Sequence, residues 1–330
     1  MLKTYKALNV VEQADGSFTR AVEELPIERL PEHDTLIRVK YSALNYKDAL
    51  SATGHKGITR QYPFTPGVDA AGEVVECKTG KFLPGDPVIV TGYDLGMNTM
   101  GGFSEYVRVP SEWVVPLPDG LSLRESMIYG TAGFTAALAL TLMERNGQSP
   151  DQGPIVITGS TGGVGSLAVA IFSKAGYDVI ATTGKADAHE FLTMLGAKRI
   201  EGRDFANRDT DKLLLRSEWA GAFDSVGGNT LHTLLKACKP YGNVAACGLV
   251  ESPKIDLSVY PFIINGVNLL GVATAENPIE EKLRIWEKLS GVWKIPQLEK
   301  ITTKISLDDI NDSIDKILDG KMKGKALVII

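Results

Sequence analysis

The stretch IVITGSTGGVGSLAVAIFSKAG, residues 155–176, decides the fold. An apolar, strand-like run ends at Thr158, four glycines fill most of the following turn, and an apolar helical run comes next. Glycine permits a tight turn and a close approach of the backbone to a pyrophosphate, and the start of a helix offers free N–H groups. The stretch therefore predicts a strand, a phosphate-binding turn and a helix.

The segments around this stretch repeat the same alternation. PIVITG, DVIATTG, KRIEG, GAFDSVG, GNVAACGL and VNLLGVA are typical of short buried strands, and helical runs such as AHEFLTMLGA and TLHTLLKACKP separate several of them. A series of βαβ units predicts an α/β fold with a parallel, doubly wound sheet. The long helix that precedes the series begins at Ser122, which together with Glu125 forms a candidate capping box.

The first 123 residues have a different character. TLIRVKYSAL alternates apolar and polar residues, and glycines and prolines interrupt the short strand-like runs. This pattern predicts a compact, barrel-like β domain. A last helix and strand follow near the end of the sequence.

Length and composition exclude several classes of protein. The 330 residues favour two domains, and 44% hydrophobic with 23% charged residues is ordinary for a globular protein. The formal net charge of -5 and the lack of basic clusters argue against a nucleic-acid partner. Three scattered cysteines fit a reducing compartment, and no signal peptide or 18-residue apolar span is present. We expect a cytoplasmic protein that is not embedded in a membrane.

Two segments predict how a dinucleotide binds. The turn would hold the pyrophosphate through four residues, Thr161, Gly162, Gly163 and Val164. The end of the next strand reads Thr183-Gly184-Lys185, without the carboxylate that grips a ribose 2′-hydroxyl. Hydroxyls and a lysine suit a 2′-phosphate, which favours NADPH. Arg203 is a second candidate phosphate ligand, and a solvated loop lysine is the alternative for Lys185.

The motifs together resemble the medium-chain dehydrogenase/reductase superfamily. TPGVDAAGEVVE, GDPVIV, GGFSEYVRVP, GTAGFTA and TGSTGGVGS occur in its order over essentially the whole chain. The resemblance implies a GroES-like β-barrel catalytic domain over residues 1–123 and 296–330. It also implies a Rossmann domain that binds NADPH over residues 124–295.

A narrower resemblance is to the acryloyl-CoA reductase and quinone oxidoreductase subfamily, carried by LNYKDAL, FDSVGG, VAACGL and PFI. This subfamily is NADPH-dependent, zinc-free and dimeric, and Lys185 replaces its usual arginine. The resemblance places further residues beside the cofactor. They are Thr131, Thr135, Leu249, Ile263 and Thr274. The segment from Asp224 to Gly227 would border the adenine or ribose.

The resemblance also exposes the lack of zinc ligands. Asn45 to Asp48 contain no cysteine where a zinc alcohol dehydrogenase has one, and Val68-Asp69 replace its His-Glu. Such residues do not build a tetrahedral nitrogen and sulfur site, so we expect no metal. Without this Lewis acid, reduction of an activated C=C bond is favoured over alcohol oxidation.

LNYKDAL then supplies the candidate catalytic residues. We expect Tyr46 to lie against the nicotinamide and to donate a proton, and Asn45 to bind the substrate carbonyl or the ribose. Asp48 would pair with Lys47 and position the loop. The alternatives are that Tyr46 packs at a domain interface and that Lys47 and Asp48 are a solvated helix start. Lys323 and Lys325 would reach an anionic substrate or remain solvated.

Three functions are compatible with these residues. The first is an NADPH-dependent reduction of acryloyl-CoA to propanoyl-CoA, with a hydride added to the β-carbon and a proton to the α-carbon. The nearest alternative is an NADPH:quinone oxidoreductase, and a further alternative is a non-catalytic NADPH-binding protein. The proline-free run NGVNLLGVA would be an edge strand through which two copies form a homodimer.

Overall fold

The structure, a computed structural model, describes residues 3–330. They pack as two compact units. The first contains the chain up to Ala132 together with Thr274–Ser290 and Gln297–Ile330, and the second contains Gly133–Ala273 and Gly291–Pro296. This division differs from the predicted boundaries, because residues 124–132 and 274–290 pack with the first unit.

The second unit is built on a six-stranded sheet. Its strands are β8 (Ile155–Ile157), β9 (Val179–Thr182), β10 (Arg199–Glu201), β11 (Trp219–Asp224), β12 (Cys238–Ala246) and β13 (Asn268–Gly271). All are parallel, in the order β10-β9-β8-β11-β12-β13. β8 is wholly buried, which explains its unbroken apolar sequence. The predicted doubly wound parallel sheet is confirmed.

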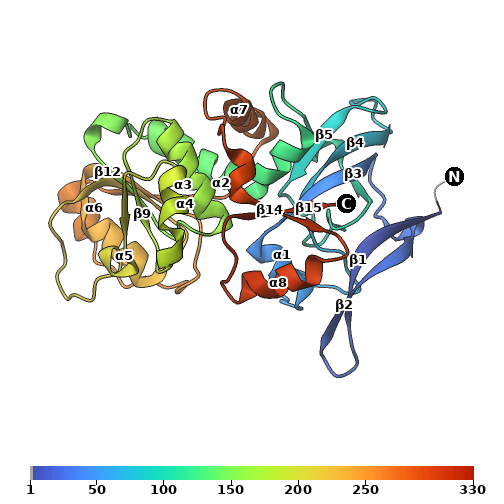
Figure 1. The fold of residues 1–330 in the computed structure, drawn as a ribbon, viewed down its shortest axis with the longest axis horizontal. Coiled ribbons are helices and arrows are strands. Elements are labelled where there is room, and N and C mark those ends of the chain that lie inside the picture. Colours follow the sequence, from blue (N-terminus) through green and yellow to red (C-terminus); the bar gives the residue numbers. More distant parts are fainter. Residues whose placement is uncertain (1–2) are drawn as a thin grey trace. The chain divides into compact units, whose positions relative to one another are not determined.

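Helices cover both faces of this sheet. They are α3 (Gly163–Lys174), α4 (His189–Met194), α5 (Gly228–Lys236) and α6 (Tyr260–Asn265). α3 and α4 lie on one side of the sheet, and α5 and α6 lie on the other (Figure 1). The direction of winding reverses between the neighbouring strands β8 and β11. Ligands of doubly wound sheets bind at the carboxyl ends of the strands at such a reversal.

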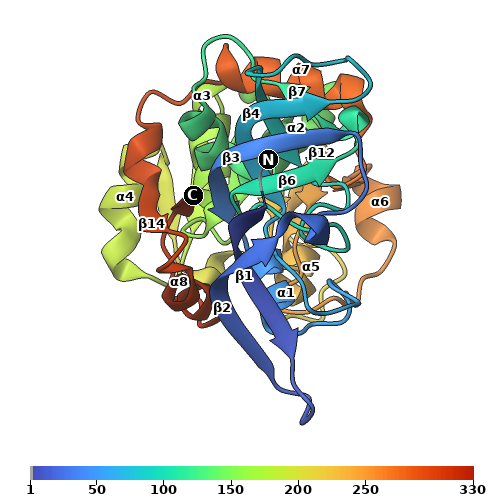
Figure 2. The same ribbon diagram turned by 90° about the vertical axis from the view of Figure 1, so that its right-hand side faces the viewer.

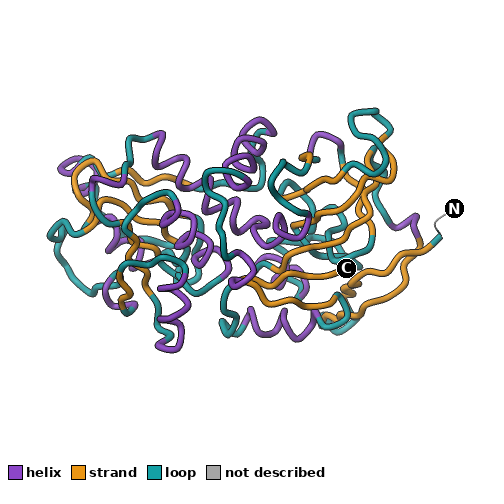
Figure 3. Tube along the Cα trace, turned by 45° about the horizontal axis from the view of Figure 1, so that its top comes forward, coloured by secondary structure: helices purple, strands orange, loops and turns teal. Residues whose placement is uncertain are grey.

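The first unit is mainly β-structure, as the tube colours show (Figure 3). Its strands are β1 (Thr4–Glu12), β2 (Phe18–Pro26), β3 (Thr35–Leu44), β4 (Asp69–Cys77), β5 (Pro87–Thr91), β6 (Tyr106–Val109), β7 (Val115–Pro116), β14 (Thr302–Ser306) and β15 (Lys325–Ile329). β1 and β2 form an antiparallel hairpin (Figure 2). The other seven form one sheet, ordered β14-β15-β3-β4-β5-β7 with β6 also on β3. The predicted β-rich character of this domain is confirmed.

The pairing of β15 with β3 and the pairing of β5 with β4 bring together the residues of the candidate site. β15 runs antiparallel to the end of β3, so that Ala326 faces Leu44 and brings Lys325 beside the start of α1 (Tyr46–Ala52). β5 runs antiparallel to β4, and Asp69 faces Thr91. The end of β3, the start of β4 and the start of β15 therefore converge.

The remaining helices are α2 (Leu123–Arg145), α7 (Ile279–Ser290) and α8 (Ile310–Leu318). The predicted capping box at the start of α2 is confirmed, because Ser122 N–H donates to Glu125 and Glu125 N–H donates to Ser122 Oγ. Among residues 3–330, α2 is the one helix long and apolar enough to cross a membrane. The structure buries 89% of its apolar window in protein, as in a core helix. α2 is interrupted at Gly130, where φ is 48° and ψ is -156°.

Candidate active site and cofactor site

The turn after β8 has the geometry that a pyrophosphate requires. Gly159 has a φ of +58°, and a Cβ at Gly165 would lie 2.2 Å from the carbonyl oxygen of Gly159. A side chain at Gly165 would clash with the backbone, and glycine is the favoured residue at the φ of Gly159. α3 begins directly after Gly162, and no side chain caps its first N–H groups. These N–H groups and the helix dipole fit the pyrophosphate of a dinucleotide, and all four predicted turn residues lie at this point.

The turn is tied to the neighbouring strand. Ser160 Oγ donates to the carbonyl of Ile157 at 2.7 Å and accepts the N–H of Thr182 at 3.1 Å. The end of β9 therefore has a fixed place beside the phosphate turn.

Two basic residues belong to the end of β9, Lys185 by its place in the sequence and Arg203 by the fold. Thr183 Oγ1 accepts the N–H of Lys185 at 3.0 Å, which shapes the turn. The exposed Arg203 comes from the segment after β10, and a Cβ at Gly184 would lie 2.9 Å from its Nε atom. The structure thus brings Arg203 to the predicted segment, although nearly twenty positions separate them. A lysine and an arginine around a glycine without a side chain fit a 2′-phosphate.

The residues predicted for the nicotinamide side fall into two groups. Leu249, after β12, and Ile263, on α6, belong to the second unit and are 64% and 69% exposed. Thr135 is buried on α2 in the same unit. Thr274 and Thr131 belong to the first unit, so the structure places them on a different body from the phosphate turn.

Within the first unit, a buried polar cluster lies where α1 begins. Asn45 Nδ2 donates to Asp69 at 2.8 Å and to Asp48 at 3.1 Å, and Asn45 Oδ1 accepts from Lys325 Nζ at 2.5 Å. Lys325 also donates to the carbonyl of Leu44 at 3.2 Å. Asp48, Asp69 and Lys325 are at most 1% exposed. Buried charges are rare and costly unless paired, so this arrangement is a candidate functional site.

Asp69 joins the cluster to α2. Its Oδ1 atom accepts the N–H of Thr131 at 2.8 Å and the Thr131 hydroxyl at 2.7 Å. The N–H of Thr131 is available because the helix is broken at Gly130. A Cβ at Gly130 would lie 2.7 Å from Asp69 Oδ2, so a larger residue would displace the carboxylate.

Burial shifts the pKa values of the charged members. Burial and, second, the charge of Asp69 raise the pKa of Asp48 to about 7. Three hydrogen bonds oppose this shift, from Val68 N–H and from the N–H and side chain of Asn45. Burial also lowers the pKa of Lys325, against the attraction of the two aspartates. The cluster therefore holds a carboxyl group that gains or loses a proton near neutral pH.

A second buried lysine lies close to this cluster. Lys282 on α7 donates to the carbonyl of Thr91, and its Nζ atom lies 3.7 Å from the centroid of the Tyr93 ring. Burial lowers the pKa of Lys282 to about 7, and the charge of Asp69 opposes that shift. Because Thr91 faces Asp69 across the β4–β5 pair, the Lys282 amine lies on the β5 side of Asp69.

The structure corrects several expectations for these residues. The Asn45 side chain is occupied by Asp48, Asp69 and Lys325, so it is not left to a substrate carbonyl or a ribose. Asp48 is buried and does not pair with the exposed Lys47. Lys325 is buried within the sheet, not on an anion-binding surface. The role of Tyr46 as proton donor is not contradicted and stays a prediction, since Tyr46 is 47% exposed at the first position of α1.

Thr131 was predicted to lie beside the cofactor, and in the structure its hydroxyl and N–H both donate to Asp69. The broken helix turns the start of its second half toward Asp69, and the proximity of Thr131 to the cofactor stays a prediction. Asp69 and Lys282 were not predicted as site residues, and Lys325 was predicted to reach an anionic substrate and not to lie in a buried cluster. Asp69 had a usable signal, since a carboxylate inside the apolar strand VDAAGEVV needs a buried partner.

Zinc does not fit the donor groups at this place. Within residues 3–330, no group of three or more His, Cys, Asp or Glu side chains is arranged to hold a metal ion. The positions that hold ligands in a zinc alcohol dehydrogenase hold the amide of Asn45 and the carboxylates of Asp48 and Asp69 here.

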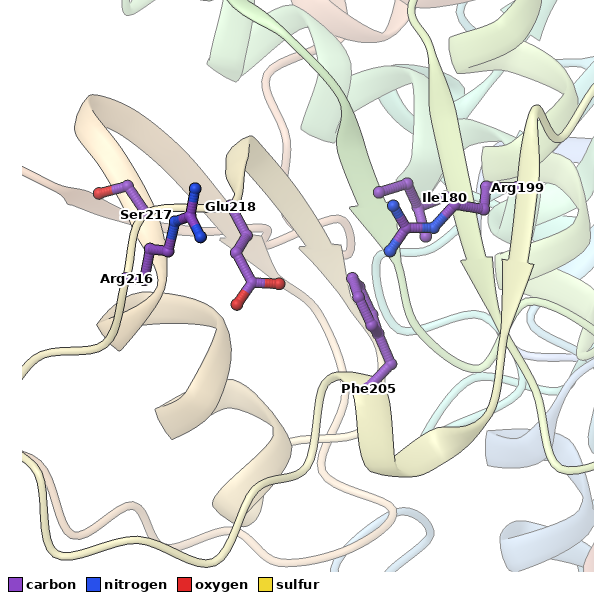
Figure 4. Close-up of a pocket in the computed structure, with 6 residues that line it drawn as sticks. All are labelled: Ile180, Arg199, Phe205, Arg216, Ser217 and Glu218. Carbon is purple, nitrogen blue, oxygen red and sulfur yellow. The ribbon is translucent and has the colours of Figure 1, made fainter.

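A cleft of about 480 Å³ opens elsewhere on the second unit. Its walls are Ile180, Arg199, Phe205, Arg216, Ser217 and Glu218 (Figure 4). Arg199 begins β10 and Glu218 directly precedes β11, so these residues lie toward the amino ends of the strands. Glu218 pairs with Arg208 at 2.6 Å. The cleft is therefore separate from the carboxyl-end turns that fit a dinucleotide.

The chain is similar to known proteins over its whole length. "Putative quinone oxidoreductase YhfP" of Bacillus subtilis is 42% identical over 99% of both chains, and its structure with NAD bound matches with a TM-score of 0.97 over 100% of both chains. "Acrylyl-CoA reductase AcuI" of Ruegeria pomeroyi is 38% identical over 96% of both. The structure of E. coli YhdH with bound NADPH is 40% identical, with a TM-score of 0.94 over 98% of this chain and 99% of that chain.

Two family descriptions match the two parts of the chain. "Alcohol dehydrogenase GroES-like domain" matches residues 31–119, and "Zinc-binding dehydrogenase" matches residues 163–289. The similarity extends across the phosphate turn and the buried cluster. The chain therefore belongs to the medium-chain dehydrogenase/reductase family, together with the acrylyl-CoA reductases and YhfP-type quinone oxidoreductases, and is an oxidoreductase that uses a nicotinamide cofactor.

Proposed function

We propose that the protein is an NADPH-dependent reductase of activated C=C bonds, with acryloyl-CoA as substrate and propanoyl-CoA as product. The buried cluster of Asn45, Asp48, Asp69 and Lys325 carries this proposal, because it stands in place of zinc ligands and fixes the start of α1. An enone or enoyl thioester needs no metal to accept electron density, since its own conjugated carbonyl does so. The acrylyl-CoA reductase among the full-length relatives supports the same substrate class.

The reaction adds two hydrogens across the double bond. The nicotinamide cofactor supplies a hydride to the β-carbon, and the chain must then deliver a proton to the α-carbon. Tyr46 is the proposed donor, because its ring is 47% exposed while its neighbour Asn45 is anchored in the cluster. Asp48 holds the turn by accepting the N–H of Asn45 at 2.7 Å. The cluster residues are thus positioning residues, and Tyr46 is the residue that meets the substrate.

We propose NADPH as the cofactor because Lys185 directly follows Gly184 and the Arg203 side chain lies beside the same glycine. Replacing Arg203 with alanine removes one charge from the proposed 2′-phosphate site, and loss of a charged hydrogen bond weakens binding on the order of tenfold or more. We expect KM for NADPH to rise in Arg203→Ala while KM for NADH stays within about twofold. Kinetic titration with both cofactors measures this, and Arg216→Ala, at the separate cleft, is the control. An equal loss for both cofactors would remove Arg203 from the 2′-phosphate site.

The substrate is tested by comparing acryloyl-CoA, crotonoyl-CoA and 1,4-benzoquinone at a fixed NADPH concentration, following absorbance at 340 nm. We expect kcat/KM to be highest for acryloyl-CoA. The relative named as a quinone oxidoreductase supports the alternative of quinone reduction. A kcat/KM that favours benzoquinone would replace the enoyl-CoA assignment with this alternative.

We also propose that two copies associate through β13. This strand is at the edge of the six-stranded sheet, with an open row of backbone groups. Several large apolar side chains on and near it are exposed. They are Val259, Tyr260, Ile263, Ile264 and Leu269. Pairing of two β13 strands would cover part of this surface in a homodimer.

A further inference from the structure

Three turns meet at the carboxyl end of the second unit's sheet, after β8, β11 and β12. We propose that Glu251, in the loop after β12, is a positioning residue that holds this loop in place for the nicotinamide half of the cofactor. The inference rests on the proposed NADPH site and is independent of which substrate is reduced.

The turn after β11 and the loop after β12 fit together without free space. A Cβ at Gly248 would lie 2.1 Å from the carbonyl oxygen of Ser225. A Cβ at Gly227 would lie 2.6 Å from the carbonyl oxygen of Ser252 and 3.1 Å from the Cα of Leu249. Glycines at these positions therefore let the two backbones touch, which explains part of the FDSVGG and AACGL sequences.

Glu251 stabilises this contact through hydrogen bonds to both the turn after β11 and the start of α5. Its backbone N–H donates to the carbonyl of Val226 at 2.8 Å. Its carboxylate accepts the N–H and hydroxyl of Thr230 at 3.1 and 2.8 Å, and the Asn207 side chain at 3.0 Å. Thr230 lies in the first turn of α5, where a negative charge also meets the positive end of the helix dipole.

These contacts keep the carboxylate charged. Burial tends to raise the pKa of Glu251, but the hydrogen bonds from Thr230 and Asn207 outweigh it and hold the pKa below its usual value. At neutral pH Glu251 is therefore ionised, so these are charge-assisted hydrogen bonds, which are the stronger kind.

The same turns are linked inward to the phosphate site. The buried Asp224 accepts the Thr158 hydroxyl at 2.6 Å and the N–H of Gly227 at 2.8 Å. Thr158 directly precedes the phosphate turn. The pyrophosphate turn, the turn after β11 and the loop fastened by Glu251 therefore form one connected set.

The order of the strands shows which part of the cofactor this loop serves. The 2′-phosphate residues follow β9 and β10, on one side of the phosphate turn after β8. The dinucleotide must therefore extend its nicotinamide half over β11 and β12, on the other side. Leu249, which is 64% exposed, is on the fastened loop beside that path.

The test measures binding of two nucleotides to the purified full chain by titration calorimetry, without any reducible substrate. NADPH contains the nicotinamide half, whereas adenosine 2′,5′-bisphosphate contains only the other half. We expect Glu251→Ala to raise the Kd of NADPH on the order of tenfold and to leave that of the bisphosphate within about twofold. Glu251→Gln, which keeps an acceptor oxygen, should recover part of the lost affinity.

Control variants separate this role from a general loss of structure. Glu190→Ala, an exposed carboxylate on α4, should change neither Kd. Asn207→Ala removes one partner of Glu251 and should weaken NADPH selectively but less. Equal weakening of both ligands by Glu251→Ala, or no weakening of NADPH, would overturn the proposal. If all variants bind as expected and acryloyl-CoA is not reduced, only the proposed substrate fails.

Discussion

Tyr46 is the one proposed catalytic side chain that is substantially exposed, and its role as acid can be separated from its role as a ring. In Tyr46→Phe the ring remains and the hydroxyl is lost. Because general acid catalysis contributes about 100-fold or more, we expect kcat with acryloyl-CoA to fall by about that factor. The Kd of NADPH should be unchanged in a fluorescence titration. A kcat near that of the wild type would remove Tyr46 as the proton donor.

Asp48 connects activity to pH, because burial raises its pKa to about 7. The ionised form accepts three hydrogen bonds, and protonation removes part of this accepting capacity, which loosens the start of α1. We therefore expect kcat/KM to decline as pH falls through about 7. In Asp48→Asn this decline should disappear and activity should be low at every pH. Initial rates between pH 5.5 and 8.5 measure the effect.

The control for this profile is Asp15→Asn, at the exposed tip of the β1–β2 hairpin. It should keep the wild-type profile. If Asp48→Asn also kept the decline near pH 7, another group would be responsible. Lys282, whose pKa burial lowers to about 7, would then be the first residue to mutate in search of that group.

At the level of elements, the break in α2 at Gly130 lets the N–H of Thr131 donate to Asp69 in the buried cluster. Alanine at Gly130 must adopt a φ of 48°, and its Cβ would lie 2.7 Å from Asp69 Oδ2. We expect Gly130→Ala to destabilise the protein by about 2 kcal/mol or more. Activity should also fall, because Asp69 is displaced. Gly80→Ala is the matched control, with a φ of +72° and no atom within 4 Å of the added Cβ.

Thermal unfolding followed by circular dichroism compares the two variants. Strain at positive φ alone costs about 1–2 kcal/mol, so Gly80→Ala should lower Tm modestly. Gly130→Ala should lower Tm further. An equal decrease in Tm in the two variants would mean that the Asp69 carboxylate moves aside without a cost in stability.

The elements also show where prediction from sequence ends. Apolar runs and glycine turns predicted β8, α3 and the parallel sheet, because these signals are local. The break in α2 was not predicted, since a glycine among alanines and leucines is compatible with a continuous helix. Arg203 was foreseen only as a candidate. Its place beside Gly184 depends on two neighbouring strands ending together.

The buried cluster around Asn45 could not be predicted from local sequence signals either, because its members come from distant segments. Asn45 and Lys325 are 280 positions apart, and their contact depends on the pairing of β15 with β3. No periodicity in either segment encodes that pairing. A lysine in GKALVII was therefore interpreted as a surface residue, although the sheet buries it.

For the whole molecule, the open edge at β13 predicts the state of assembly. Light scattering at micromolar concentration should give twice the chain mass of 35.5 kDa. A lysine at an edge strand opposes pairing, so Leu269→Lys should shift the population toward the monomer. Leu83→Lys, at an exposed leucine of the first unit, should remain dimeric. A wild-type protein that is monomeric would contradict pairing through β13.

The pairing of β15 with β3 also has a consequence for how the protein assembles after synthesis or after denaturation. The second unit is almost one continuous segment, Gly133–Ala273, whereas the first unit is completed only when distant segments join. Closing so long a loop costs entropy before any contact repays it, which slows the step. The parallel sheet is thus expected to form early and the β15–β3 ladder late. Because Lys325 enters its place only with that ladder, enzymatic competence should appear after most of the helix content has already recovered.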